Sequence, residues 1–341
     1  AEVFDRAASD FSKTALEIFR FQFDNNSIYK QFATSLGKTP DKVHSVSQIP
    51  FLPVEFFKSH EIYCGTEVPE IIFSSSGTTG SATSSHFVKS RRHYELSCFA
   101  GFTSAYGSPK DCVFLFLLPS YLVHEARLKA SGGQGSSLVF MADYLRRLSI
   151  DEDTLRGNPQ GDQSFFLNNY SELASRLASL NKYNQGKKVI LLGVTYALLD
   201  LAEQFPQDLS NITIMETGGM KGKRKEITRE ELHAILKKAF NVSAIHSEYG
   251  MTELLSQAYS KGDGIFTCPP WMKIMIRETN DPLSWCANGK TGGVNIIDLA
   301  NIYSCSFIST SDLGKVHDDG SFEILGRFDF SDTRGCNLLV E

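Results

Sequence analysis

The sequence lacks several features that would place the protein in a specialised class. No apolar run reaches the length of about 18 residues that a membrane-spanning helix needs, so no transmembrane segment is expected. Asp5, Arg6 and Asp10 interrupt the apolar positions near the N-terminus, which is not the pattern of a signal peptide. The seven cysteines are odd in number and include no Cys-x-x-Cys pair, so neither a disulfide framework nor a zinc site is predicted. These absences predict a cytoplasmic protein.

The excess of charge of either sign is also small. The chain has 34 Lys and Arg against 39 Asp and Glu, which gives a formal net charge of −5. A protein that binds nucleic acid through bulk charge is strongly basic, so no nucleic-acid partner is expected. With 341 residues, of which 42% are apolar, the chain can bury a large core in one large domain or two fused halves.

The strongest local signal is a run of eight residues, all Ser, Thr or Gly, at positions 74–81. It follows the apolar residues 71–73, which indicate the end of a strand. Glycine lets the backbone turn tightly and approach a ligand, while hydroxyls and successive N–H groups can bind an anion. This composition suits a polyphosphate, although a flexible surface loop has the same composition. The candidate phosphate-binding positions are Ser76, Gly77, Thr78, Thr79 and Gly80.

Three further motifs follow along the chain. Residues 248–253 are Glu-Tyr-Gly-Met-Thr-Glu, residues 311–314 are Ser-Asp-Leu-Gly, and residues 326–329 are Gly-Arg-Phe-Asp. Together with the Ser/Thr/Gly run, and in this order, they resemble the signature motifs of the adenylate-forming superfamily. That superfamily includes acyl-CoA synthetases, aryl-CoA ligases and luciferases. The resemblance covers residues 45–336.

The resemblance and the periodicity of the sequence indicate the same α/β fold. Between residues 171 and 249 short apolar strands alternate with helical stripes, which predicts parallel sheet with helices packed on its faces. After residue 262, short strands separated by Gly and Pro predict a small, mostly antiparallel β subdomain. We therefore expect the large N-terminal domain of the adenylate-forming fold, without its C-terminal lid domain. The expected parts are an α/β adenylation core at 1–262, a small β-rich subdomain at 263–326 and a hinge-like tail at 327–341.

Several individual elements are predicted from local patterns. A helix is expected over residues 91–106, and Thr228 with Glu231 forms a capping box at the start of another. The apolar residues 138–141 predict a strand. The aromatic cluster at 51–57 belongs either to the core or to a substrate pocket, and the core is favoured because most such clusters are core.

The resemblance implies how the site would bind the triphosphate of ATP. The Ser/Thr/Gly loop would hold the β- and γ-phosphates through Thr78, Thr79 and the backbone around Gly80. Thr252 would donate a hydrogen bond to a phosphate oxygen. Glu253 would bind Mg²⁺, which prefers hard oxygen ligands.

The resemblance also implies how the site would bind adenosine. Tyr249 would offer a flat face to the adenine, beside a strand end at Gly218 and Gly219. Asp312 would accept hydrogen bonds from the ribose hydroxyls, with Arg327 close to the same ribose. Taken singly, carboxylates at such positions are often solvated surface groups, but the order of the motifs favours the functional interpretation. The remaining positions of the expected site are Gly250 and Met251.

Two departures from the family pattern matter. Members of the family usually carry a Pro-Lys-Gly sequence soon after the Thr-Thr-Gly, whereas here the first lysine after it is Lys89. The chain also stops before the mobile domain that brings the family's catalytic lysine. The candidates for a substitute cation are Lys221, Lys223 and Arg224, although an ordinary basic loop would have the same residues.

Without a lid domain the chain resembles a shorter branch, the LuxE-type acyl-protein synthetases. Residues 118–122, 192–196 and 334–337 are similar to that branch, whose members adenylate a fatty acid and move the acyl group to a C-terminal cysteine. Cys336 occupies the matching place, and Arg334 beside it would lower the pKa of its thiol, unless the cysteine is a passive tail residue. Members of the branch pass the acyl group to a partner acyl reductase, which implies the same partner here.

Two other functions remain open at this stage. An acid–thiol ligase of the phenylacetate-CoA type would release its product as a soluble CoA thioester. A non-catalytic subunit would bind an adenylate without forming one. Either enzyme would use ATP and Mg²⁺ and a small-molecule carboxylic acid, and the 25 Phe and 12 Tyr residues suit fatty and aryl acids equally.

Overall fold

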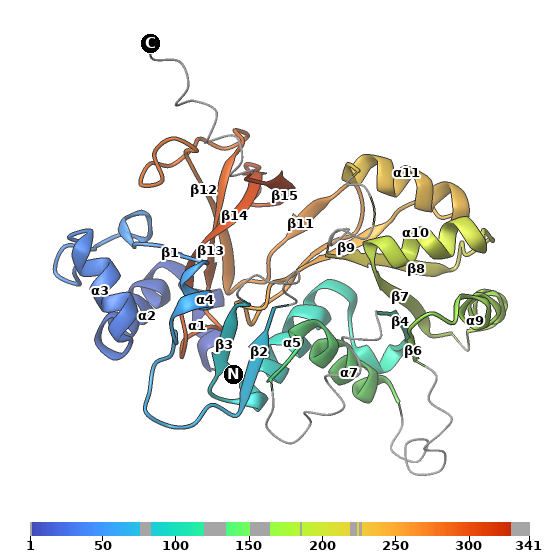
Figure 1. Ribbon diagram of the computed structural model, residues 1–341, viewed down its shortest axis with the longest axis horizontal. Helices are drawn as coiled ribbons and strands as arrows, with labels where there is room; N and C mark the ends of the chain where they lie inside the picture. The colour runs from blue at the N-terminus through green and yellow to red at the C-terminus, as the bar shows by residue number, and fades with distance from the viewer. Residues whose placement is uncertain are drawn as a thin grey trace.

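One long mixed sheet and one small sheet organise the chain (Figure 1). The computed structural model describes residues 2–75, 83–118, 134–150, 164–184, 186–218, 224 and 227–328. The long sheet has twelve strands and consists of a parallel half and an antiparallel half that share hydrogen-bonded neighbours. The site described below lies where these halves meet.

The parallel half contains the strands with the longest apolar runs. In spatial order these strands are β6 (Phe165–Phe166), β4 (Cys112–Leu117), β7 (Lys188–Val194), β8 (Ile212–Thr217) and β9 (His246–Tyr249). All residues of β7 after the first are buried, as expected for a parallel strand that is covered on both faces. The predicted parallel sheet is thereby confirmed.

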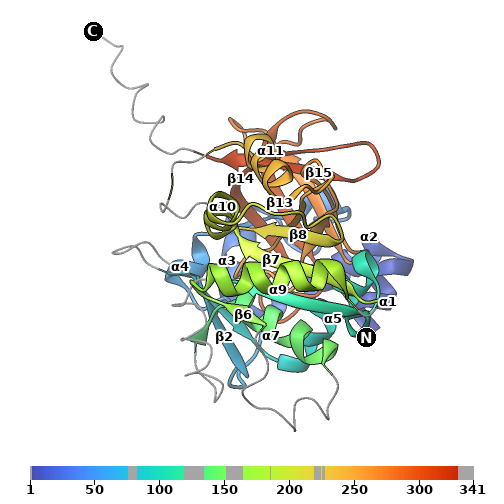
Figure 2. The same cartoon turned by 90° about the vertical axis from the view of Figure 1, so that its right-hand side faces the viewer.

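Helices cover both faces of the parallel half (Figures 1 and 2). One face carries α9 (Tyr170–Lys182), α10 (Thr195–Gln204) and α11 (Arg229–Phe240), which connect successive parallel strands. The other face carries α5 (Arg91–Tyr106) and α7 (Ser137–Ser149), which pack against each other. This arrangement leaves the carboxyl ends of β8 and β9 free to present polar side chains.

The helix ends follow the sequence signals. At the start of α11 the Thr228 side chain accepts a hydrogen bond from Glu231 N, and the Glu231 carboxylate accepts one from Thr228 N. The predicted capping box is therefore confirmed. The helix predicted over residues 91–106 is α5, and it ends at Gly107, whose positive φ of 87° favours glycine.

The antiparallel half continues the same sheet. In spatial order its strands are β10 (Ala258–Ser260), β11 (Ile265–Thr267), β15 (Phe322–Arg327), β14 (Phe307–Val316), β13 (Gly292–Asp298) and β12 (Met272–Arg277), and β1 (Leu52–Pro53) pairs with β14. Strand β11 pairs through only two residues with each neighbour, so it forms a narrow link between β10 and β15. The sheet runs without interruption past residue 262.

Short N-terminal helices pack on the antiparallel half (Figure 1). Gln22 fixes them there, because its amide donates to Asn301 O and Ile302 O at 2.9 and 2.8 Å. The helices are α1 (Glu2–Ser9), α2 (Phe11–Asn25), α3 (Ser27–Ser35) and α4 (Phe56–Ser59), and 3-10 turns η1 and η2 lie at Val46–Gln48 and Pro109–Asp111.

The small sheet holds the strands on either side of the Ser/Thr/Gly run. Strands β2 (Ile71–Ser74) and β3 (Ser85–Val88) are antiparallel, and β5 (Gln134–Gly135) pairs with β2 in parallel. Ser74 and Ser85 are direct partners, so the loop leaves and re-enters the sheet at one place.

One predicted element is wrong and one open question is settled. Residues 138–141 lie in α7, not in a strand, because Val139, Ala142 and Leu145 are buried at helical spacing. A four-residue apolar run cannot distinguish the two structures by itself. The aromatic segment 51–57 belongs to the core, where Phe51, Leu52, Val54 and Phe57 are all buried.

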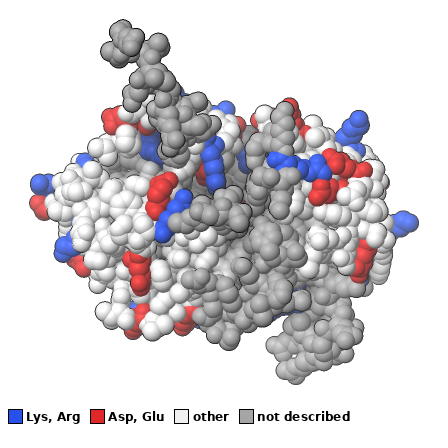
Figure 3. Space-filling model, in the orientation of Figure 1, with Lys and Arg blue, Asp and Glu red and all other residues white. Residues whose placement is uncertain are grey.

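The distribution of charged side chains on the surface agrees with the low net charge. Acidic and basic side chains are interspersed over the visible face, and the described residues form no broad basic field there (Figure 3). Among the described residues, no helix combines the length and apolar character needed to cross a membrane.

Candidate active site

Three of the four sequence motifs meet in one hydrogen-bonded contact. Tyr249, the last residue of β9, donates through its hydroxyl to Asp312 Oδ2 at 2.7 Å. Arg327 Nε donates to the other oxygen, Asp312 Oδ1, at 3.1 Å. Asp312 and Arg327 are direct partners in the β14–β15 ladder, so the sheet register holds the pair. The Asp312 carboxylate is buried, whereas the Arg327 side chain is 79% exposed.

The base of the Ser/Thr/Gly loop lies beside the same turn. Ser75 N donates to Ser84 O at 3.1 Å and Ser84 N donates to Ser75 Oγ at 2.9 Å, which closes the loop at its base. The Ser84 side chain also hydrogen-bonds to Glu253, the last residue of the Tyr-Gly-Met-Thr-Glu turn. All four motifs therefore converge on one region.

Glu253 is a buried carboxylate that forms no close ion pair among the described residues, although Arg327 and Lys58 are near enough for their charges to lower its pKa. Its side chain is nearly covered, and burial raises its pKa, with the hydrogen bond from Ser84 acting in the opposite direction. Its backbone carbonyl accepts a hydrogen bond from Asn301 Nδ2 at 2.8 Å, which fixes the end of the turn. A carboxylate held in this way gains by contact with a cation.

The donor set at the turn suits one particular kind of metal ion. Within the described ranges no three or more His, Cys, Asp and Glu side chains come together in a metal-ligating group. Mg²⁺ commonly binds through one or two carboxylates and completes its shell with substrate phosphates and water. The single Glu253 carboxylate beside the predicted phosphate loop therefore fits Mg²⁺ better than a metal that needs an all-protein cage.

A buried histidine supports the turn from behind. His86 on β3 has Nδ1 at 2.8 Å from Thr252 O and Nε2 at 3.0 Å from Asn301 Oδ1. Burial lowers the pKa of His86 to about 4, so the imidazole is neutral near pH 7. The Asn301 amide donates to Glu253 O and to Cys305 O, and so it ties the turn to the antiparallel half. Sequence reasoning did not identify His86 or Asn301 because 215 residues separate them and neither lies in a motif.

A second carboxylate lies just before the turn. Glu248 is buried on β9, and burial raises its pKa to about 7, although Thr217 Oγ1 donates to it at 2.5 Å. Glu216 on β8 is also buried but faces Arg229, whose Nε lies 3.3 Å away. A Cβ at Gly250 would lie 2.5 Å from Glu248 Oε1, so any larger residue there would displace the Glu248 carboxylate. Neither glutamate was predicted as part of the site.

Of the other predicted residues, some are described by the structure and the rest lie outside the described ranges. Gly218 ends β8 with a φ of 71°, which favours glycine, and its carbonyl accepts from Thr195 Oγ1 at 2.9 Å. Met251 Sδ lies 3.7 Å from the Tyr249 hydroxyl. Arg224 binds Asp200 and Glu203 of α10, so its charge is already paired. The residues that lie outside the described ranges are Ser76, Gly77, Thr78, Thr79, Gly80, Gly219, Lys221, Lys223 and Cys336.

Comparison with known sequences gives no match. No protein-family model matches the chain, and no curated protein matches it. The similarity lies in the three-dimensional structure, where several solved structures match with probability 1.00.

Two structures of 2-hydroxyisobutyryl-CoA ligase in complex with 2-HIB-AMP and CoA match most of the chain. The open conformation has a TM-score of 0.66 at 12% identity over 93% of this chain and 69% of that one. The thioesterification state has a TM-score of 0.65 at 14% identity over 97% and 69%.

ATP-bound MatB from Rhodopseudomonas palustris also matches, with a TM-score of 0.51 at 13% identity over 77% of this chain. The chain spans 49% of the length of that protein and of an ATP-bound RpMatB-BxBclM chimera. Identities this low establish the fold alone. The chain has the fold of the large N-terminal domain of adenylate-forming enzymes.

Proposed function

We propose that the chain activates a carboxylic acid with ATP, as an acyl-adenylate. The main observation in support is that the four motifs converge. The Tyr249–Asp312–Arg327 contact joins three of them, and the Ser84–Glu253 contact joins the base of the Ser/Thr/Gly loop to the same turn. The fold supports the proposal, because the matched structures include MatB with bound ATP and 2-hydroxyisobutyryl-CoA ligase with bound 2-HIB-AMP.

The reaction joins two anions, and the proposed roles follow from that difficulty. A carboxylate oxygen of the acid bonds to the α-phosphorus while the bond from that phosphorus to the pyrophosphate oxygen breaks. Glu253 would hold Mg²⁺, which neutralises phosphate charge when it is bound. Thr252 and the loop residues Thr78 and Thr79 would donate to phosphate oxygens. Asp312 would accept from the ribose hydroxyls at the point where β14 and β15 pair.

The second proposed step moves the acyl group to Cys336 and then to a partner acyl reductase, as in LuxE-type acyl-protein synthetases of the cytoplasm. The thiolate sulfur would attack the acyl carbon of a fatty acyl-adenylate and release AMP. In support, burial raises the pKa of every cysteine in the described ranges, to about 12 for two of them, so those thiols are poor nucleophiles. The six are Cys64, Cys98, Cys112, Cys268, Cys286 and Cys305.

Pyrophosphate exchange followed by intact mass measurement tests both steps. A panel of carboxylic acids of different chain length is incubated with ATP, Mg²⁺ and labelled pyrophosphate. We expect exchange with at least one acid, and one acyl group on the protein that hydroxylamine removes. Cys336→Ser should keep the exchange and lose the acyl group, whereas Cys286→Ser, which changes a half-buried thiol, should keep both.

The main alternative is an acid–CoA ligase, which the CoA in the matched ligase structures favours. A product that forms only on addition of CoA, or a label that persists in Cys336→Ser, would replace the acyl-protein synthetase by this alternative. Absence of exchange with every acid would indicate a non-catalytic adenylate-binding subunit.

A further inference from the structure

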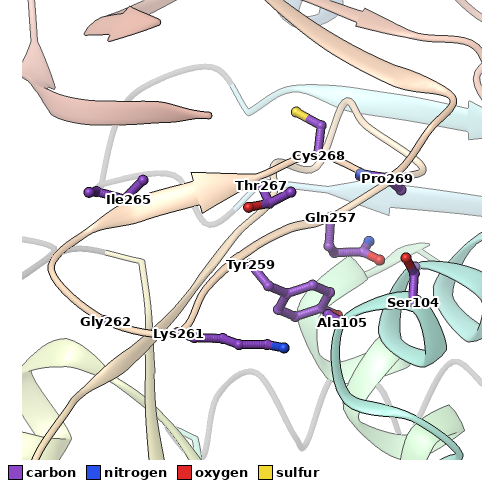
Figure 4. A pocket seen from close by; sticks show the side chains of 11 residues that line it. Ser104, Ala105, Gln257, Tyr259, Lys261, Gly262, Ile265, Thr267, Cys268 and Pro269 are labelled. Atoms are coloured by element: carbon purple, nitrogen blue, oxygen red, sulfur yellow. The ribbon is translucent and has the colours of Figure 1, made fainter. Parts of the chain in front are cut away.

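A cavity lies outside the residues of the four motifs. It has a volume of about 320 Å³ and lies between the second half of α5 and the β10–β11 hairpin (Figure 4). Ser104 and Ala105 line it from the helix, and Gln257, Tyr259 and Lys261 line it from the strand. A cavity of this volume falls at the small end of the range that protein ligand sites occupy.

The inner end of the cavity carries a hydrogen-bond acceptor that no described residue satisfies. The Gln257 side chain is 5% exposed, and its Oε1 has no partner among the described residues. The amide also hydrogen-bonds to Cys98, which holds the group in place. An unpaired buried acceptor has lost its hydrogen bonds to water, so a donor that reached Oε1 would bind favourably there.

The outer end carries an unpaired cation. The Lys261 ammonium lies 5.7 Å from the centre of the Tyr106 ring. In the described part of the chain Lys261 forms no ion pair, and its recorded contact is the one with the Tyr106 ring. The lysine is exposed at the mouth of the cavity, where it can meet an anion from solvent.

The spacing of these two groups defines the ligand. Gln257, Tyr259 and Lys261 alternate along the strand and face the same side, as Figure 4 shows. At about 3.3 Å per residue, Gln257 and Lys261 are separated by about 13 Å along the backbone. We propose that the cavity binds an elongated small organic anion, with its carboxylate on Lys261 and a hydroxyl or amine donor on Gln257.

The proposed site lies next to the Tyr-Gly-Met-Thr-Glu turn but is not part of it. A Cβ at Gly250 would lie 3.5 Å from Gln257 Cγ, so the inner end of the cavity touches that turn. If a ligand on Gln257 changes the affinity of the turn for nucleotide, nucleotide at the turn changes the affinity for the ligand by the same factor. Binding itself requires neither ATP nor Mg²⁺, so it can be tested independently of the proposed function.

Three matched probes test the recognition on the unmodified protein. The probe is 6-hydroxyhexanoate; hexanoate lacks the donor and 1,6-hexanediol lacks the charge. Ligand-observed NMR titrations without ATP measure the three dissociation constants. We expect 6-hydroxyhexanoate to bind at least about tenfold more tightly than 1,6-hexanediol, because a charged hydrogen bond contributes about 1.5–3 kcal/mol, and about fivefold more tightly than hexanoate.

Two variants locate the binding. Lys261→Met should weaken 6-hydroxyhexanoate by about tenfold. Gln257→Leu should abolish the preference for 6-hydroxyhexanoate over hexanoate. Lys273→Met, which changes an exposed lysine on β12, is the control and should bind as the wild type does. Equal affinity for the three probes, or an affinity that Lys261→Met leaves unchanged, would overturn the proposal, whatever the exchange assay shows.

Discussion

The two halves of the long sheet place their polar groups differently. In the parallel half β4, β7 and β8 are largely apolar along their length, and polar side chains gather toward the carboxyl ends, as Glu216 and Thr217 do at the end of β8. In the antiparallel half, polar side chains are buried in the middle of strands, as Asn295, Thr310 and Asp312 are.

The difference shows two ways of fixing a functional group. At the end of a parallel strand the chain leaves the sheet, so the position of Glu253 depends on hydrogen bonds from outside the strand, such as the one from Asn301. In the antiparallel half the ladder itself positions Asp312 opposite Arg327. Asp298 of β13 links the antiparallel half to the chain just beyond the turn. It accepts hydrogen bonds from Leu255 N and from Ser256 N and Oγ.

The largest expected effect tests the parallel side of this comparison. Glu253→Gln keeps the volume of the side chain and removes its charge. Loss of a comparable electrostatic partner costs on the order of 10²–10³ in rate, so ATP–pyrophosphate exchange should fall by that factor while the far-UV circular dichroism stays the same. Glu61→Gln, at an exposed position, is the control. Exchange within a few-fold of wild type would remove Glu253 from the site.

The next effect concerns stability and pH at the end of β9. Burial raises the pKa of Glu248 from 4.5 to about 7, so the folded state keeps a proton that the unfolded state releases. The free energy of unfolding should therefore fall as pH rises from about 4.5 to about 7, by up to roughly 3 kcal/mol. Urea unfolding of Glu248→Gln at a series of pH values should show a smaller slope than wild type, whereas Glu61→Gln should keep the wild-type slope.

A third prediction tests the antiparallel side. Arg277 on β12 is buried and donates to Asn295 Oδ1 at 2.7 Å and Thr310 O at 2.6 Å. Arg277→Met leaves these acceptors unpaired and should lower the free energy of unfolding by about 2 kcal/mol. Lys273→Met, on the same strand but exposed, should change it by less than about 0.5 kcal/mol. Equal stability of the two variants would mean that mid-strand polar contacts do not hold this half.

The smallest effect is the most specific. Ser84→Ala removes a hydrogen bond that favours the charged form of Glu253, so the pKa of Glu253 should rise further. In the plot of exchange rate against pH, the rise on the acidic side should therefore move to higher pH. The lost hydrogen bond should contribute about 1 kcal/mol, at the low end of the range for a hydrogen bond to a charged group. Ser59→Ala, on the exposed end of α4, should leave the profile where it is.

The comparison also explains what could be predicted from sequence. The parallel half was predictable because each element carries its own signal, as in the buried run of β7 and the capping box of Thr228 and Glu231. The signal failed at residues 138–141, where a short apolar run suits either a strand or a helix. Tertiary contacts with β4 and α5 decide that case, and they are not visible in a local window.

The site shows the same limit. Tyr249, Asp312 and Arg327 were predicted because they lie in motifs, and the structure brings them into contact. His86 and Asn301 could not be predicted, because their role exists only where β3 passes behind the turn. Polar side chains in the core are recognised by their partners, and partners distant in sequence leave no local pattern.

The narrow link at β11 has a consequence for the cooperativity of unfolding. Two backbone ladders of two residues each join β10 to β15 through β11, so few backbone hydrogen bonds hold the sheet together at this place. Arg229 bridges the same place, since it donates to Ile324 O at 2.7 Å and lies 5.2 Å from the centre of the Phe266 ring. One guanidinium thus helps decide whether the chain melts as a single unit or as two, and the amide exchange of β11 reports which of these occurs.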